Sequence, residues 1–144
     1  MTSVDVVDTP PTLSPEVRAF LSETRFAVVA TVDPDGAPHS AVVWYRLEGD
    51  ELVLNSAGGR RWPANLRRDP RVEVTVADGY RYVQLRGTVS VIDDQAVAQA
   101  DIAEMARRYH ADEPAKAEAL IRDRFTRQQR VSFRLRPSRI GVDL

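Results

Sequence analysis

Tight turns between short β-rich runs are the feature that most restricts the fold of this chain. Residues 26–32 are apolar and rich in β-branched side chains, and Asp33-Pro34-Asp35-Gly36 follows with proline and glycine placed as in a turn. Asp78-Gly79, a pair typical of two-residue hairpin loops, separates two later runs. Strands joined by such short connections pair antiparallel, so we expect an antiparallel sheet.

Runs with strand character dominate both halves of the chain, and few helical patterns separate them. The first three are expected to form a meander through the turns at 33–36 and 48–50. Gly87 lies inside the long run 80–92 and is expected to mark a bulge or bend. The pattern disfavours a doubly wound parallel sheet and predicts a mainly β (α+β) fold, a six-stranded antiparallel barrel with flanking helices. The expected strands span residues 26–32, 40–47, 51–55, 71–77, 80–92 and 130–135, with 140–144 as a candidate for a last short strand.

Helix signals flank and interrupt the strands. Ser14-Pro15 combines an N-cap residue with a proline suited to the first helical position. Residues 1–13 are polar and proline-bearing, so we expect a flexible N-terminal arm (1–13) followed by one domain (14–144). The other helices are expected to begin near Pro63, after Asp93-Asp94 and at Glu113-Pro114.

Composition excludes several classes of function. The chain has 144 residues and a net charge of −1, which gives no general attraction to nucleic acid or membranes. It contains no cysteine, so disulfides and thiolate metal sites are absent. Neither a signal peptide nor a membrane span is evident, and a cytoplasmic protein is expected.

A glycine–arginine segment, residues 55–72, has the character of an anion-binding site. The pair Gly58-Gly59 allows backbone N–H groups to approach a ligand closely, and Arg60-Arg61 stand at the expected start of a helix. Guanidinium groups suit phosphate, so we interpret Arg60 and Arg61 as phosphate-binding. Arg67, Arg68 and Arg71 instead fit a solvated arginine face on a surface helix, with Asp69 available for local pairing.

Side chains that could carry catalysis are scarce. The two histidines, His39 and His110, match no zinc motif, and neither a nucleophile elbow nor a nucleotide-binding loop is present. No metal site is expected and no catalytic residue can be named. If the protein is an enzyme, a cofactor must supply the reactivity. Tyr80, Arg81 and Trp44 could stack on a planar ring, or could equally form cross-strand pairs or a dimer contact.

Two runs of the chain resemble a known family. They are Asn65-Leu66-Arg67-Arg68-Asp69-Pro70-Arg71-Val72 and Val83-Gln84-Leu85-Arg86-Gly87-Thr88-Val89. In this order, after residues 26–38, they resemble the pyridoxamine 5'-phosphate oxidase-like family of FMN-binding split β-barrels. Within it, the chain is most similar to the branch that uses the deazaflavin coenzyme F420.

The resemblance implies a homodimer with cofactor sites at the subunit interface. Tyr80 and Arg81 would then come from the partner subunit. Many relatives carry lysine where this chain has Trp62. Either Arg60 or Arg61 replaces that lysine, or Trp62 instead stacks on the cofactor or covers its pocket. The residues placed around the cofactor are Ser40, Val42, Trp44, Asn55, Ser56, Ala57, Arg60, Arg61, Trp62, Asn65, Tyr80 and Arg81.

The resemblance implies hydride transfer from reduced coenzyme F420 to a conjugated or electron-poor small molecule. Two alternatives stay open at this point. One is an FMN-dependent oxidase or reductase of the same fold. The other is a non-catalytic module that binds flavin or haem.

Overall fold

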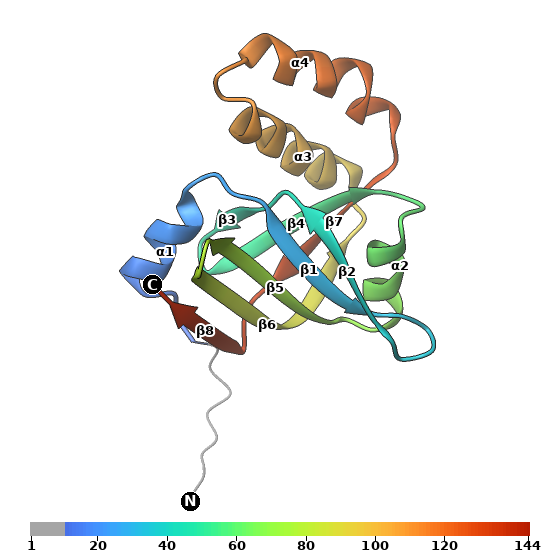
Figure 1. Cartoon of the computed structure of the whole chain (residues 1–144). Coiled ribbons are helices and arrows are strands. Elements are labelled where there is room, and N and C mark those ends of the chain that lie inside the picture. The colour runs from blue at the N-terminus through green and yellow to red at the C-terminus, as the bar shows by residue number, and fades with distance from the viewer. Residues whose placement is uncertain (1–10) are drawn as a thin grey trace, which may run out of the picture.

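In the described part of the chain, a single antiparallel sheet of eight strands forms the centre of the molecule (Figure 1). The structure is a computed structural model that describes residues 11–144. The strand order is β2-β1-β5-β6-β7-β4-β3, with β8 paired to β6, and the sheet curls into a split barrel. The predicted fold class is confirmed, with eight strands instead of six: β1 (Ala27–Val32), β2 (Pro38–Val43), β3 (Arg46–Glu48), β4 (Glu51–Ala57), β5 (Arg71–Asp78), β6 (Arg81–Ile92), β7 (Arg130–Leu135) and β8 (Arg139–Asp143).

The strand expected over residues 40–47 is two strands, and the predicted meander is wrong. β2 pairs with β1, whereas β3 pairs with β4 at the opposite edge of the sheet. The break falls at Tyr45, whose backbone N–H donates to the hydroxyl of Tyr109 (3.1 Å) instead of to a neighbouring strand. The buried Tyr45 hydroxyl donates to the Leu21 carbonyl (2.8 Å), which holds the chain in this crossing.

The long strand β6 changes partners along its length, as the expected bend at Gly87 requires. Its first part pairs with β5 and β8, and from Val89 onward it pairs with β7. A Cβ on Gly87 would lie 3.0 Å from Leu135 Cδ1 and 3.1 Å from the Arg136 carbonyl oxygen. Glycine therefore permits the close approach at which the two halves of the barrel join.

Within residues 11–144, four α-helices and one 3-10 turn surround the sheet, and α3 and α4 lie together on one side of it (Figure 1). Two of the predicted caps are present, because Ser14 Oγ accepts from the Val17 N–H and Asp94 accepts from the N–H groups of Ala96 and Val97. The bounds are α1 (Pro15–Ser22), α2 (Arg61–Arg68), α3 (Gln95–Tyr109), α4 (Pro114–Asp123) and η1 (Phe125–Arg127).

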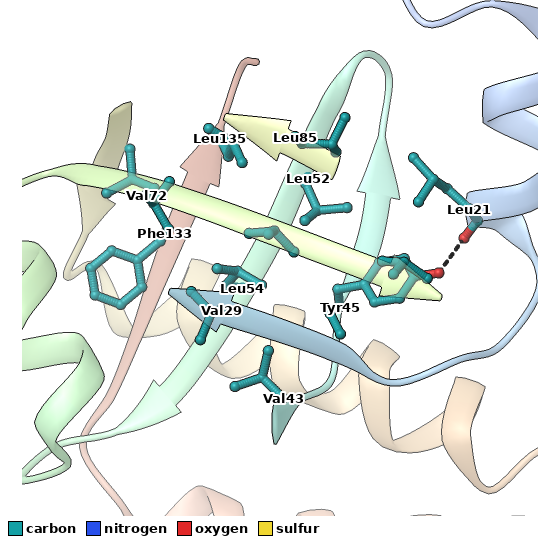
Figure 2. Close-up of a cluster of buried hydrophobic side chains, with 14 of the residues drawn as sticks. Leu21, Val29, Val43, Tyr45, Leu52, Leu54, Val72, Leu85, Phe133 and Leu135 are labelled. Atoms are coloured by element: carbon teal, nitrogen blue, oxygen red, sulfur yellow. Dashed lines mark hydrogen bonds between the residues drawn. The ribbon is translucent and has the colours of Figure 1, made fainter. Parts of the chain in front are cut away.

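The main core fills the barrel and extends to α1 (Figure 2). Alternate residues of the strands, such as Val29, Leu54 and Phe133, point inward and are fully buried. A smaller cluster that includes Ile102, Met105 and Phe125 packs α3, α4 and η1 against β4. The helical excursion between β6 and β7 is therefore fixed on the barrel.

Two further predictions concern the N-terminal arm and membrane-spanning helices. Residues 1–10 of the predicted arm lie outside the described residues, while Leu13 at its end is buried in the core. Among residues 11–144, none of the helices has the length and hydropathy needed to cross a membrane.

Candidate functional site

A cavity of about 280 Å³ opens where the ends of β2 and β4 meet the helical excursion. Its walls come from four separate parts of the chain: the β1–β2 edge, the β4–α2 connection, α3, and the segment 124–130. The lining combines apolar and cationic side chains: Phe26, Val42, Val43, Trp44, Asn55, Ser56, Ala57, Arg60, Trp62, Ile102, Arg124, Phe125, Gln128 and Arg130.

Stacked aromatic rings form one wall of this cavity. The ring of Trp44 lies parallel to that of Tyr109, with centroids 4.9 Å apart and planes 6° apart. Phe125 meets the edge of Trp44 at 90°. Phe26 stacks on Tyr109 at 5.7 Å and is 62% exposed, which leaves an apolar ring at the mouth. Such a wall suits a flat conjugated ligand.

Arginines lie beside this aromatic wall, and the guanidinium carbon of Arg130 stands 5.0 Å from the centroid of the Phe125 ring. Arg60, Arg124 and Arg130 all line the cavity. None of the three makes an ion pair with a carboxylate of the described residues 11–144. Burial, followed by the positive charges of Arg60 and Arg124, lowers the pKa of Arg130 to about 10. This side of the cavity is therefore positively charged without a fixed counter-ion.

A chain of buried polar groups continues from Arg130 into the core. The Nε of Arg130 donates to Asn55 Oδ1 (3.0 Å), and Asn55 Nδ2 donates to Ser132 Oγ (2.9 Å). Ser132 Oγ donates to Asp101 Oδ2 (2.6 Å), and Arg46 donates to the other oxygen of Asp101 (2.6 Å). Asp101 therefore has its own cations, and its charge does not compensate the cavity arginines.

The start of α2 has backbone donors at the cavity. Gly59 adopts a φ of +89°, a conformation that favours glycine, and leads into Arg60 at the N-cap. No side chain of the described residues caps this helix, and because Pro63 has no N–H, the free donors of its first turn are the N–H groups of Arg61 and Trp62. These donors and the arginines attract anions in the same region.

The structure brings together seven of the twelve residues expected around a cofactor. These are Val42, Trp44, Asn55, Ser56, Ala57, Arg60 and Trp62. Trp62 is 4% exposed and its ring lies 5.5 Å from that of Phe133, so it is a floor residue anchored in the core.

The other five lie away from the lining. Arg61 donates to Asp33 Oδ2 (3.0 Å), and the buried amide of Asn65 donates to Thr31 Oγ1 and Asp33 Oδ1 (both 3.0 Å), so both side chains fasten α2 to β1. Ser40 is exposed on β2. Tyr80, 95% exposed, and Arg81 stand at the β5–β6 hairpin.

Sequence reasoning missed half of the lining, including every lining residue that follows α3. Arg130 was recognised only as the start of a strand, although it lies opposite Ala57 in the β4–β7 register, and Ala57 was in the expected set. No local motif marks Arg124, Phe125 or Gln128 as neighbours of β4. The missed residues are Phe26, Val43, Ile102, Arg124, Phe125, Gln128 and Arg130.

No group of three or more histidine, cysteine or acidic side chains that could hold a metal occurs in the described part of the chain.

A curled antiparallel sheet with a mixed apolar and cationic cavity at its edge defines a split β-barrel protein. The model of the pyridoxamine 5'-phosphate oxidase family matches residues 13–142. The chain belongs to this family, as its sequence resemblance predicted.

Similar proteins include ones that are named for coenzyme F420. The F420H(2)-dependent biliverdin reductase of Mycobacterium tuberculosis (strain CDC 1551 / Oshkosh) is 29% identical over 119 residues, covering 81% of this chain and 86% of that protein. A solved F420 reductase has a TM-score of 0.68 at 25% identity, covering 86% of this chain and 94% of its own. A conserved hypothetical protein of Mycobacterium tuberculosis has a TM-score of 0.75 at 25% identity, covering 95% and 88%.

Proposed function

We propose that this protein is a coenzyme F420-dependent oxidoreductase that transfers a hydride from the reduced deazaflavin to a conjugated or electron-poor small molecule. One observation carries the proposal: a single cavity combines an aromatic wall with three arginines that have no carboxylate partner among residues 11–144. A cofactor that joins a flat ring to a phosphate needs this same combination of groups. The F420-dependent relative supports the choice of deazaflavin over FMN.

The residues present fit such a cofactor. Val42, Trp44 and Phe125 would contact the ring, whereas Arg60, Ser56 and the N–H groups at the start of α2 would contact the phosphate end. When bound, the reduced deazaflavin supplies the hydride. The side chains of this protein bind and orient the two reactants and exclude water from the ring, because the lining offers no general acid or base in an evident position. Arg61 and Asn65 act indirectly, by holding α2 in place.

A homodimer would complete the site. Val42 is 69% and Val28 41% exposed, and they face one another across β2 and β1. The same row of cross-strand partners continues over the outer face of the sheet through Thr75 and Gln84 to Gly141. None of these residues is aromatic or charged. Because Phe26 and Val42 belong both to the cavity and to its exposed rim, a second copy on this face would enclose the cavity. The exposed loop with Tyr80 and Arg81 is proposed to reach the other copy.

Titration of the purified chain with F420 and, separately, with FMN tests the proposal. We expect F420 to quench tryptophan fluorescence through Trp44 and Trp62 and to raise the melting temperature more than FMN does. Reduced F420 should then be oxidised by a panel of conjugated acceptors that includes biliverdin, the substrate in the relative's name.

The same samples test assembly, since sedimentation equilibrium should give twice the chain mass of 16.1 kDa. Stabilisation by FMN alone would replace the proposal with the FMN-dependent alternative. Binding without turnover of any acceptor would favour a non-catalytic carrier. A monomeric mass with F420 bound would refute the dimer.

A further inference from the structure

We infer that Arg130 binds the anionic group of the ligand, with Arg124 and Arg60 beside it, and that Arg61 at the start of α2 does not. The inference rests on the proposed function, since it assigns one side of the same cavity. It moves the main anion contact from the glycine–arginine segment to the start of the neighbouring strand β7, which sequence reasoning did not associate with binding.

Arg130 is buried without a counter-charge. It is 6% exposed, and the two acceptors of its guanidinium are neutral amides: Asn55 Oδ1 at 3.0 Å from Nε and Gln128 Oε1 at 2.6 Å from Nη1. Its other terminal nitrogen, Nη2, donates to no acceptor among the described residues. Buried arginines ordinarily pair with carboxylates, so a cavity-lining guanidinium with an unused nitrogen calls for a ligand anion.

Two glutamines of α3 fix the wall that carries Arg130. Gln95 accepts from the Arg130 N–H (3.0 Å) and donates to the Arg130 carbonyl (2.7 Å). Gln99, one helical turn later, donates to the carbonyls of Phe125 and Gln128 (3.0 and 2.9 Å). The segment 125–130 is thus held at both ends, and Arg130 is preorganised before any ligand arrives.

The start of α2 has fewer side chains available to bind an anion than its sequence suggests. The Arg61 guanidinium is committed to Asp33, which also accepts from Asn65. Trp62 is uncharged and packs on Phe133. Arg60 at the N-cap is the one arginine of this pair that lines the cavity.

The three cavity arginines act together. Arg60 and Arg124 are close enough to Arg130 to repel its charged form, and both are exposed. A phosphate between them would relieve this repulsion and accept a charge-assisted hydrogen bond from the unused Nη2 of the buried Arg130. The buried contact should contribute most, because water screens the two at the rim.

Paired ligands that differ by the phosphate test this assignment. The affinity of the full-length chain for F420, and for the phosphate-free deazaflavin chromophore, is measured by fluorescence titration at fixed salt. We expect Arg130→Gln to weaken F420 about 30-fold while changing chromophore affinity less than about threefold. Arg130→Lys should recover part of the loss, and Arg124→Gln should cost only several-fold.

Arg127→Gln is the matched control, because Arg127 is exposed in the same segment and does not line the cavity. Arg61→Gln should also leave F420 affinity within about threefold. The inference is overturned if Arg130→Gln weakens both ligands equally, or if Arg61→Gln causes the phosphate-specific loss instead. If Arg130→Gln does not fold, an Arg60→Gln/Arg124→Gln double variant replaces it, and an unchanged F420 affinity overturns the inference. Failure of the wild-type chain to bind F420 or FMN at all would refute the proposed function.

Discussion

The arginines around α2 and the arginines around the cavity differ in what their guanidinium groups contact. Around α2, Arg61 pairs with Asp33 (3.0 Å) and Arg71 with Asp69 (2.7 Å), while Arg67 pairs with Asp93. At the cavity, Arg124 and Arg130 have no carboxylate partner among the described residues. The carboxylates of the fold neutralise the first group, whereas no carboxylate among residues 11–144 neutralises the second.

This difference separates structural from binding roles within one residue type. The short sequence between Asn55 and Asn65 contains members of both groups, since Arg60 lines the cavity and Arg61 does not. Adjacent residues at the N-terminus of a helix point in different directions, about 100° apart around the axis. The direction of each side chain, and not the density of arginine in the sequence, decides which group it joins.

The largest expected effect is on the free energy of unfolding, and it tests the polar contacts around α2, where the arginines pair with carboxylates. Asn65→Ala removes two donors and one acceptor from a residue that is 2% exposed, and leaves the Asp33 carboxylate poorly satisfied. We expect the free energy of unfolding to fall by about 2–3 kcal/mol, measured by urea denaturation, with F420 affinity of the folded variant nearly unchanged. Arg67→Ala, at an exposed pair, should cost less than about 1 kcal/mol. A stable Asn65→Ala protein that fails to bind F420 would contradict the division of roles.

The fold was largely predictable from sequence, whereas the site was predictable only on one wall. Turn residues such as Asp78-Gly79 and caps such as Ser14 act locally, so their effect can be read without the rest of the chain. The crossing at Tyr45 was missed because its backbone partner, Tyr109, lies 64 residues away. Arg130 was missed for the same reason. Its binding role depends on the β4–β7 register and on Gln95, which no local pattern specifies.

A smaller effect on the free energy of unfolding, of opposite sign, tests the arginines that line the cavity. Removing an uncompensated buried charge relieves a cost, and glutamine at position 130 retains a donor for Asn55 Oδ1. Arg130→Gln is therefore expected to leave the free energy of unfolding unchanged or raise it by up to about 1 kcal/mol, at the expense of F420 affinity. Urea denaturation of the ligand-free protein measures this. A destabilisation comparable to that of Asn65→Ala would mean that Arg130 is structural and that the two groups of arginines do not differ.

The smallest expected effect is a difference in acid sensitivity. The hydrogen bond from Asn65, followed by the charge of Arg61, holds the pKa of Asp33 below its ordinary value of 3.8. The unfolded chain therefore takes up this proton first as the pH falls. The stabilisation from Asp33 is complete above about pH 4 and is lost as the pH falls through the folded-state pKa. The stability of Asp33→Asn should thus approach that of the wild type below about pH 4.

Two controls make this comparison specific. Asp69, whose pKa Arg71 lowers to about 2, titrates at low pH in the wild type and in Asp33→Asn alike, so its contribution cancels in the difference between them. Arg124→Gln removes a cavity arginine that has no carboxylate partner among the described residues, and its stability should run parallel to that of the wild type from pH 5 to about pH 3. Parallel curves for Asp33→Asn would show that the carboxylate is not stabilised by its partners. An acid-dependent difference for Arg124→Gln would show that a cavity arginine has a carboxylate partner after all. Either result would remove the distinction between the two groups, because it depends on which arginines the fold itself neutralises.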